Sequence, residues 1–373
     1  MTIKRWGHQG IVGHRIWAGA LLGLLLTVGC SEGDRQSAAQ QHQTYNWRMV
    51  TSWPPNSPGL GTAANELARN IETMSAGRLK IKVYGAGELV PALEVFEAVS
   101  SGSAHMGHSA SYYWRGKIPA AQFFSAVPFG MTVNEQNAWL YYGGGLELWH
   151  EIYEPFGLTA FPAGNTGPQW AGWFNKELNT TDDLRGLIMR IPGLGGEVMV
   201  QAGAQQQQLP GNEIFTALET GTIDAAEWVN PFVDLSMGFY QVAKYYYYPA
   251  WHEQSVTLEL LINDAAWQEL PQDLQAIVQS AARAANADMP DLFAARNPEI
   301  LQQLVQEHGV ELRPLPKELL LELRTHAQRS IAELVQSDPD FARVHQSWQA
   351  FLQKTEPYRK MTETPVLEIR QLD

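Results

Sequence analysis

The chain has 373 residues, a formal net charge of −13 at pH 7 and a single cysteine. This acidic balance argues against nucleic acid or anionic lipid as a partner, and a lone cysteine excludes a fold held together by its own disulfides. The length exceeds what one hydrophobic core usually organises, so we expect two domains.

The first 29 residues differ from the rest. Lys4, Arg5 and Arg15 form a basic start, and an apolar run of about a dozen residues follows and ends at Val28. A basic start before a short apolar run is the arrangement of a secretory signal. The alternative is a permanent anchor helix, but the run is shorter than the roughly 20 residues that span a bilayer. We therefore predict a signal peptide over residues 1–29 and an exported mature chain.

Cys30 follows the apolar run directly. A cysteine after Gly29 resembles the lipid-modified cysteine of bacterial lipoproteins, although Thr27 stands where those signals usually carry leucine. Lipidation would tether the protein to a membrane without making it span the bilayer. Loss of residues 1–29 would remove three basic residues and no acidic one, taking the net charge from −13 to −16. An anionic ligand would then have to be held by specific local cations.

Residues 30–43 are polar and without periodicity, which indicates a flexible tether. Ordered structure should begin near Tyr45, and from there strand and helix patterns alternate, which predicts an α/β fold with sheets covered by helices. We expect Pro290 to interrupt the longest helix. The predicted strands are 45–51, 79–84 and 104–108, and the predicted helices are 61–75, 91–100, 271–297, 316–335 and 341–355.

The sequence contains a short internal repeat. Residues 95–105 and 214–224 each read as a helix, a glycine and the start of a strand, at a constant offset of 119. Two similar α/β units suggest two similar lobes. Because ligands of open α/β sheets bind at the carboxyl ends of strands, two facing lobes would share one cleft.

No motif of a nucleophilic, phosphate-binding or zinc-dependent enzyme is present. His105 and His108 are three apart on a predicted strand and so face opposite ways, which disfavours a shared metal. Arg190 ends a strand that is apolar on both sides, and a buried guanidinium is costly unless it is paired. The partner can be a carboxylate of the protein or one of a ligand, for which the planar guanidinium offers two parallel bonds.

Four short polar or aromatic segments are the other candidates for a binding site. Aromatic walls with a few polar groups are typical of small-molecule pockets. For the segment that contains Glu227, a surface loop is the alternative interpretation. Tyr245 to Tyr248 alternate as a strand and are interpreted mainly as packing. The four segments are 112–114, 165–169, 227–228 and 251–254.

Several motifs together resemble the extracytoplasmic solute-binding proteins of TRAP transporters. The resemblance extends from about Tyr45 to about Glu356 and is narrowest to the branch that binds 2-oxo acids such as pyruvate, or 2-hydroxy acids such as lactate, with a metal cation. The motifs are Thr51-Ser52-Trp53-Pro54, Gly87-Glu88-Leu89-Val90, Arg190-Ile191-Pro192-Gly193, Gly221-Thr222-Ile223-Asp224-Ala225-Ala226-Glu227-Trp228 and Trp251-His252-Glu253.

The resemblance implies a two-lobed, type II-like periplasmic-binding-protein fold with crossover strands, a long helix spanning both lobes and hinge closure around the ligand. It places the first lobe at residues 44–165 and 254–295 and the second at 166–253 and 296–356. Residues 357–373 form a C-terminal tail that neither the residues nor the family explain. The run Gln205 to Gln208 is likewise unexplained.

The resemblance also implies roles for single residues. Arg190 would hold the carboxylate, and Asn165 and Tyr112 would complete the pocket beside Trp228. The cation ligands would be the Gln169 side chain, Glu227 with the Trp228 backbone carbonyl, and Glu253. Two carboxylates beside a small anion would repel it unless a cation lay between them. An all-oxygen set of ligands suits Na⁺ or Ca²⁺ better than zinc.

The expected function is that of a periplasmic receptor that delivers a small monocarboxylate to the membrane subunits of a TRAP transporter. The receptor is a monomer or a homodimer. One alternative is a metal-independent receptor for a larger organic anion or a dicarboxylate. The other is a secreted enzyme that uses Glu227 and Glu253 as an acid–base pair. It is disfavoured because nothing in the sequence activates a nucleophile.

Overall fold

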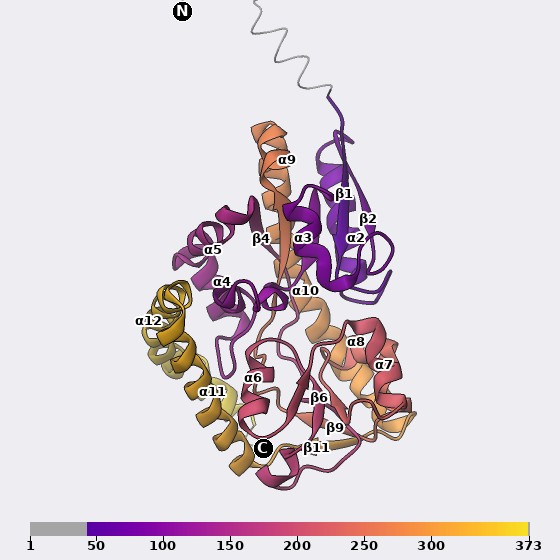
Figure 1. Cartoon of the computed structure of the whole chain (residues 1–373), viewed down its shortest axis with the longest axis vertical. Coiled ribbons are helices and arrows are strands. Elements are labelled where there is room, and N and C mark those ends of the chain that lie inside the picture. The colour runs from indigo at the N-terminus through magenta and orange to yellow at the C-terminus, as the bar shows by residue number, and fades with distance from the viewer. Residues whose placement is uncertain (1–42, 372–373) are drawn as a thin grey trace, which may run out of the picture. The chain divides into compact units, whose positions relative to one another are not determined.

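The computed structural model describes residues 43–371, which form a mixed α/β fold with two β-sheets (Figure 1). The predicted signal peptide, Cys30 and the tether up to residue 42 lie outside the described residues. Among the helices of residues 43–371, none is long and apolar enough to cross a membrane.

The first sheet has five strands in the order β2-β1-β3-β10-β4. β1 runs parallel to β2 and β3, whereas β10 is antiparallel to both β3 and β4. Trp47 and Met49 alternate with exposed residues along β1 and enter the core, as period-2 patterning requires. The strands are β1 (Tyr45–Thr51), β2 (Leu79–Tyr84), β3 (Met106–Ser109), β4 (Leu158–Asn165) and β10 (Thr257–Asn263).

The second sheet has six short strands in the order β11-β9-β5-β8-β6-β7. β6 lies parallel to β7 and β8, so the carboxyl ends of β6 and β8 reach the same edge of the sheet. The unexplained glutamine run contributes β7. The strands are β5 (Gly172–Phe174), β6 (Ile188–Arg190), β7 (Gln205–Gln207), β8 (Ala225–Ala226), β9 (Tyr245–Tyr248) and β11 (Glu311–Pro314).

Helices pack against both sheets. Local chemistry fixes some of their ends: Thr132 and Glu135 form reciprocal side-chain to backbone hydrogen bonds at the start of α4, a capping box. The helices are α2 (Gly61–Met74), α3 (Val95–Ser100), α4 (Val133–Tyr142), α5 (Gly145–Tyr153), α6 (Gly193–Gln201), α7 (Gly211–Glu219), α8 (Pro231–Met237), α9 (Asp264–Glu269), α10 (Gln272–Gln306), α11 (Lys317–Ser337), α12 (Pro339–Thr362) and α13 (Thr364–Ile369).

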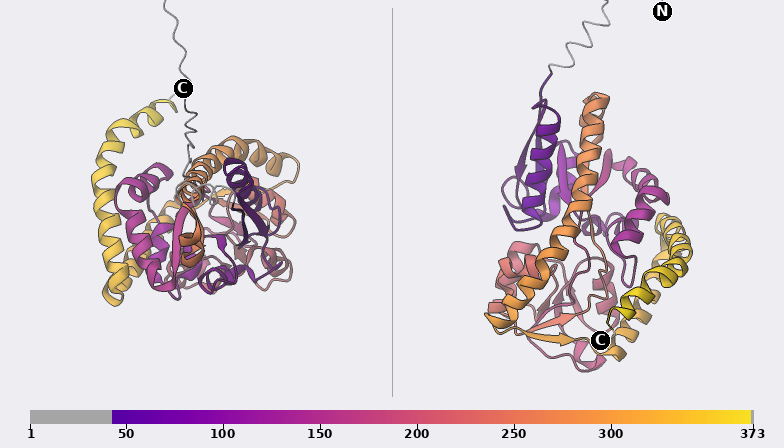
Figure 2. Two further views of the ribbon diagram at one scale, coloured as in Figure 1. Left: turned by 90° about the horizontal axis from the view of Figure 1, so that it is seen from above. Right: turned by 180° about the vertical axis from the view of Figure 1, so that it is seen from behind.

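The chain passes between the two sheets three times. It leaves the first sheet after β4 and enters the second at β5, returns between β9 and β10, and passes once more along α10 before β11. Figure 2 shows α10 running past both halves of the fold. The expectations that Pro290 interrupts this helix and that the helix ends at residue 297 are wrong, because α10 continues through Pro290 and Pro298 to Gln306. Packing against β4, α2 and α8 holds it along its length.

The internal repeat corresponds to two equivalent α/β units. β3 begins at Met106 and β8 at Ala225, which are 119 residues apart, and each strand follows a short helix. Each lies inside its sheet, beside a parallel neighbour. The two-sheet α/β fold class predicted from the sequence is therefore confirmed.

The C-terminal helices cover different halves of the molecule. α11 packs on α6, whereas α12 packs on α4 and α5 of the half that carries the first sheet. Phe123 contacts Phe341 and Trp348 there, with ring centroids 4.7 and 5.8 Å apart. Residues 339–356, which the sequence places with the second lobe, thus pack against the first. Helix continues to Ile369 in the unexplained tail.

Candidate functional site

The candidate site is built at the edge of the second sheet where β6 and β8 end. Arg190 is the last residue of β6 and pairs with Ala226, and Glu227 follows β8 directly. His252 and Glu253 come from the connection between β9 and β10, and Gln169 from the connection between β4 and β5. The site therefore combines strand ends with the segments that join the two sheets, as expected for ligands of open α/β folds.

Arg190 is fixed by the protein on one side and freer on the other. Its Nη1 donates to both the backbone carbonyl and the Oε2 of Glu227, the latter at 3.0 Å, and its Nε donates to the Leu209 carbonyl at 3.2 Å. Nη2 makes only a long contact of 3.5 Å to the hydroxyl of Tyr113. The guanidinium also lies 5.0 Å from the Trp228 ring. The outer edge of the guanidinium, around Nη2, is thus the part that can receive a further acceptor.

Two acidic side chains lie in this buried region. Glu227 and Glu253 are no more than 3% exposed, and Arg190 is the cation that faces them. Burial raises the pKa of Glu253 well above its usual range, the neighbouring Glu227 raises it further, and Arg190 partly offsets this. One arginine does not balance two buried carboxylates, so the site favours an additional positive charge.

Several buried polar atoms here have no hydrogen-bond partner among the described residues. Buried polar groups are normally paired, so a cluster of unpaired ones indicates a missing ligand, ion or water. Gln169 donates from Nε2 to Thr166 Oγ1 at 3.1 Å, which leaves its oxygen free. The unpaired atoms are Gln169 Oε1, Glu227 Oε1, Glu253 Oε2, His252 Nδ1 and His252 Nε2.

The free oxygens are suitable ligands for a cation. One amide oxygen and two carboxylate oxygens form a hard donor set, which Na⁺ and Ca²⁺ prefer. The two carboxylates supply the negative charge that such an ion needs. Residues Gln169, Glu227 and Glu253, which the sequence predicts as cation ligands, therefore fit the ion chemically. The fourth predicted ligand, the Trp228 carbonyl, belongs to the residue after Glu227 in the same loop.

Tyr112 and Asn165, the other predicted pocket residues, differ in their surroundings. Tyr112 lies against Tyr113, 4.9 Å between ring centroids, and burial raises the pKa of its hydroxyl, with Glu253 the largest charged contributor. Asn165 is engaged by the protein: it donates to Ser255 Oγ at 3.1 Å and accepts from Gly167 N at 2.9 Å. Asn165 thus holds the connection between the sheets, and no polar atom of its side chain is left unpaired.

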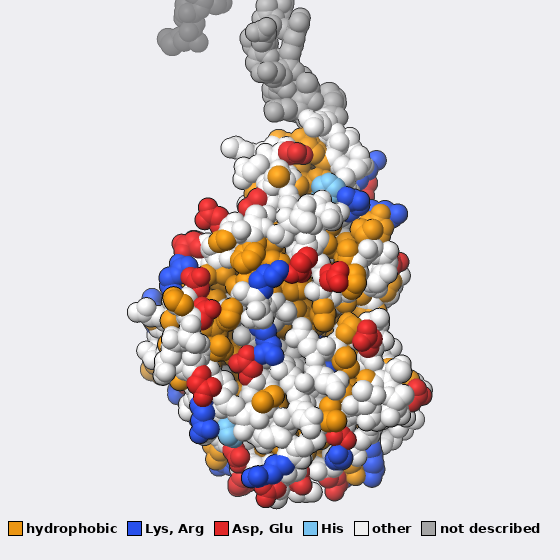
Figure 3. Space-filling model, viewed as in Figure 1, with side chains coloured by type: hydrophobic (Ala, Val, Ile, Leu, Met, Phe, Trp, Pro, Cys, Tyr) orange, Lys and Arg blue, Asp and Glu red, His pale blue; other side chains and the backbone are white. Residues whose placement is uncertain are grey.

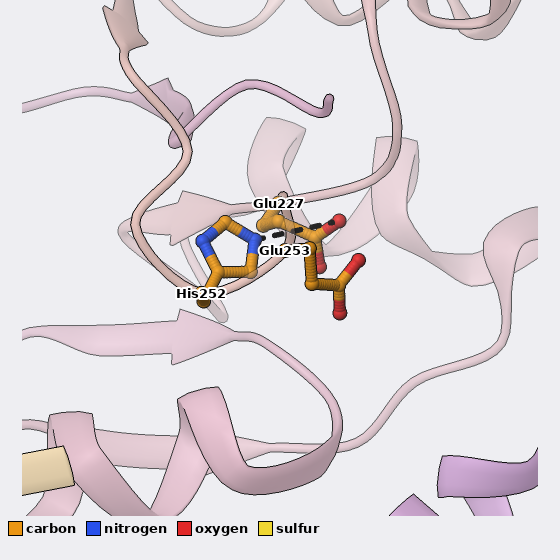
Figure 4. A group of neighbouring side chains, drawn as sticks. All are labelled: Glu227, His252 and Glu253. Atoms are coloured by element: carbon orange, nitrogen blue, oxygen red, sulfur yellow. Dashed lines mark ion pairs between the residues drawn. The ribbon is translucent and has the colours of Figure 1, made fainter. Parts of the chain in front are cut away.

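Sequence reasoning did not assign two of the residues that the fold brings to the site. Tyr113 faces Arg190, and the aromatic cluster that contains it was the only available signal. His252 is the second: its Nε2 lies 3.9 Å from Glu227 Oε1. In Figure 4 the dashed line joins these two atoms, and the Glu253 carboxylate lies beside that of Glu227. The sequence pattern around His252 indicated a polar turn, but it contained no spacing of residues that is typical of a metal site.

The site is enclosed. Its polar side chains are at most 4% exposed. A crevice of 450 Å³ opens between the two halves and is lined by Val90, Pro91 and Leu93 from one half and Pro210 and Asn212 from the other. Figure 3 shows hydrophobic side chains gathered across the middle of the face, where the two halves meet. A ligand held in the site would be shielded from bulk water.

Comparison with known proteins gives consistent relatives over almost the whole described chain. Residues 49–338 match the family model DctP, described as bacterial extracellular solute-binding protein, family 7. A monocarboxylate 2-oxoacid-binding periplasmic protein of Nostoc sp. PCC 7120 is 42% identical over 336 residues, covering 90% of this chain and 92% of that protein.

Two crystal structures are similar in fold and sequence. A TRAP periplasmic solute-binding protein from Pseudoalteromonas atlantica T6c, with bound sodium and pyruvate, has a TM-score of 0.85 and 42% identity and covers 87% of this chain and 99% of that one. A TRAP transporter solute-binding protein from Bordetella bronchiseptica RB50 has a TM-score of 0.86 and 36% identity, with coverage of 88% and 97%. It is a mixed-occupancy dimer with copurified calcium and picolinate in one active site.

Proposed function

The chain belongs to the DctP family of bacterial extracellular solute-binding proteins, and from this premise we propose that its site binds a small 2-oxo or 2-hydroxy monocarboxylate together with Na⁺ or Ca²⁺. Proteins of this family are transport receptors and not enzymes, so the acid–base alternative for Glu227 and Glu253 is wrong. The receptor works outside the cytoplasm and passes its solute to the membrane subunits of a TRAP transporter.

The observation that carries the proposal is the set of unpaired, buried oxygens beside one arginine. Gln169 Oε1, Glu227 Oε1 and Glu253 Oε2 have no partner among the described residues. A cation held by them would supply positive charge for the solute's carboxylate and keto or hydroxyl oxygens. The Pseudoalteromonas atlantica relative, which binds sodium and pyruvate, supports this combination of ligands.

Arg190 would hold the solute's carboxylate through its outer edge. The inner edge is taken by Glu227 and Leu209, so the guanidinium keeps its orientation before the solute arrives. Such preorganisation lowers the entropic cost of binding. Tyr112 and Tyr113 would form the opposite wall, from the half that carries the first sheet. Asn165 would act through the connection that it holds between the sheets.

Entry of the solute would require the two halves to separate. The site side chains, Tyr112 and Tyr113 included, are at most 8% exposed, so the arrangement described above corresponds to a closed receptor. We propose hinges at the connections over residues 166–171 and 249–256, with α10 bending as the third connection. The lobes would then be residues 44–165 with 254–295, and residues 166–253 with 296–337. Residues 339–356 would move with the first lobe.

Calorimetric titration tests the ligand and the cation together. Metal-stripped protein would be titrated with pyruvate, lactate and a dicarboxylate, each with Na⁺, with Ca²⁺ and with chelator alone. We expect pyruvate or lactate to bind more tightly with a cation than in chelator. Equal affinity with and without cation would overturn the cation's role. Preference for the dicarboxylate in chelator would establish the metal-independent receptor instead.

We further propose that the chain is an exported lipoprotein held at the membrane through Cys30. This proposal is supported by the basic start, the apolar run and the position of the cysteine, all of which lie outside the described residues. The Cys30→Ser variant should move from the membrane fraction to the soluble extracytoplasmic fraction. An unchanged distribution would rule out lipid attachment at this residue.

We also propose a homodimer in which the C-terminal tails are exchanged. Figure 2 shows the yellow end of α12 and α13 curving away from the other described residues, and its large apolar side chains are 52–72% exposed. A groove of 620 Å³ between α11 and α12, lined by Phe129, Ile331, Trp348 and others, offers an apolar surface on the same chain.

Two copies related by a twofold axis could cover both surfaces, because the tail of each copy would lie in the groove of the other. The Bordetella bronchiseptica relative, a dimer, supports a dimeric state. The exposed tail residues are Tyr358, Met361, Val366, Leu367 and Ile369.

A further inference from the structure

His252 is a buried imidazole without a hydrogen-bond partner. Its side chain is 1% exposed, and neither Nδ1 nor Nε2 is within hydrogen-bonding distance of a suitable atom among the described residues. A neutral imidazole carries one donor and one acceptor, and each buried group left unsatisfied costs about 1–3 kcal/mol. A side chain used only for packing at this position would not need ring nitrogens.

The ring lies beside the two carboxylates of the proposed cation site. His252 Nε2 is 3.9 Å from Glu227 Oε1, too far for a hydrogen bond. One ligand atom each from Glu227, His252 and Glu253 can be chosen so that all three lie within 4.8 Å of one another. Glu227 Oε2 is held by Arg190, whereas Glu227 Oε1 and Glu253 Oε2 are unpaired. Each of the three neighbouring side chains therefore carries an unpaired donor atom.

The donor types suit a first-row transition metal. Zn²⁺ binds imidazole nitrogen and carboxylate oxygen at about 2.0–2.2 Å in tetrahedral sites, so two donors of one ion lie about 3.4 Å apart. His252 Nε2 and Glu227 Oε1 are 3.9 Å apart, so the side chains would have to close slightly on the ion. Imidazole nitrogen is a preferred ligand of Zn²⁺ and Co²⁺ and not of Na⁺ or Ca²⁺.

We propose that His252, Glu227 and Glu253 form a second donor set, which takes a divalent transition-metal ion of the Zn²⁺ or Co²⁺ class. This set shares both carboxylates with the proposed all-oxygen site, but it uses His252 where that site uses Gln169. The two kinds of cation would therefore compete for one position. The inference depends on the same carboxylates as the proposed function, but its test does not depend on solute binding.

The absorption spectrum of bound Co²⁺ tests the donor set directly. Metal-stripped protein titrated with Co²⁺ should develop visible ligand-field bands, and added Zn²⁺ should abolish them by displacement. His252→Gln should weaken Co²⁺ binding by at least about tenfold, since even outer partners of metal ligands change affinity 10–100-fold. His326→Gln is the matched control, because His326 lies on α11, 3.5 Å from Glu322 and outside the site. It should leave the bands unchanged.

A second variant keeps the test decisive if His252→Gln does not fold. In His252→Cys a thiolate would take the place of the imidazole, and Co²⁺ should then give an intense thiolate charge-transfer band in the near ultraviolet. Absence of this band, or visible bands that persist in His252→Gln, would overturn the proposal. Wild-type protein that binds pyruvate with Ca²⁺ but shows no Co²⁺ bands would remove this inference and leave the proposed function intact. Co²⁺ bands without any solute binding would do the reverse.

Discussion

Arg190 and Glu227 form an ion pair of 3.0 Å in which both side chains are no more than 1% exposed. Desolvation makes such a pair weak evidence for stability, whereas removal of one partner leaves a buried charge alone. The pair holds the guanidinium with its outer edge toward the site. We interpret the pair as an orienting device for solute capture.

Arg190→Ala should lose both capture and stability. Loss of a buried charge partner should weaken carboxylate binding by about 2 kcal/mol or more, roughly 30-fold. Because Glu227 would be left unpaired, the free energy of unfolding should fall by about 3–5 kcal/mol. Titration calorimetry and denaturant unfolding measure the two effects. In the double variant Arg190→Leu with Glu227→Gln, stability should recover and binding should not. Binding restored in that double variant would show that Arg190 does not contact the solute.

Glu253→Gln should change which cation supports binding. The substitution keeps an oxygen but removes one negative charge, and a unit charge about 4 Å from a cation is worth about 4 kcal/mol per unit of cation charge at an effective dielectric of 20, before desolvation. Ca²⁺ therefore loses about twice what Na⁺ loses. Pyruvate titrations in each cation should show a larger loss of affinity with Ca²⁺. Glu66→Gln, on the exposed face of α2, should change neither. Equal losses in both cations would place Glu253 outside the cation site.

The sequence predicted local structure well where side-chain periodicity was strong. The strands over 45–51 and 79–84 agree with β1 and β2 to the residue. It failed for the end of α10, because contacts with β4 and α8 sustain a helix through two prolines. It also could not assign α12 to a half of the molecule, since an amphipathic pattern shows which face is buried and not which surface buries it.

Part of the candidate site could be predicted from the sequence. Arg190 was detectable as a single charge within an apolar strand, and the carboxylates followed from the resemblance. His252 was not, because its role depends on two oxygens that the fold brings to it from distant loops. The pocket role of Asn165 is implied by the resemblance and stays a prediction, and the structure adds that its amide joins β4 to Ser255 and Gly167.

Glu259 should make the stability of this protein depend on pH. Burial raises its pKa to about 8, although Trp114 Nε1 and Tyr153 donate to it at 2.6 and 2.9 Å. The unfolded value is about 4.3. Between these values the folded state holds a proton that the unfolded state has released, so the free energy of unfolding falls as pH rises, by up to about 1.4 kcal/mol per unit.

The Glu259→Gln variant tests this pH dependence, because it cannot ionise. In denaturant unfolding at pH 5, 6, 7 and 8, the free energy of unfolding of the variant should increase relative to that of the wild type as pH rises. For the control Glu72→Gln, on the exposed face of α2, the difference in free energy of unfolding from the wild type should be the same at every pH. A constant difference between Glu259→Gln and wild type would mean that Glu259 is ionised in the folded protein throughout this range.

The exposed tail should control the oligomeric state. Leu367 and Ile369 are 52% and 66% exposed, so replacing both with glutamate should leave the folded monomer intact. If the tails are exchanged between copies, the charges would be buried in the partner's groove, and the dimer should dissociate. Sedimentation velocity over a concentration series measures this, with Met74→Glu, 47% exposed on α2, as the matched control. A wild-type monomer at all concentrations, or a dimer that survives both charges, would rule out the tail as the interface.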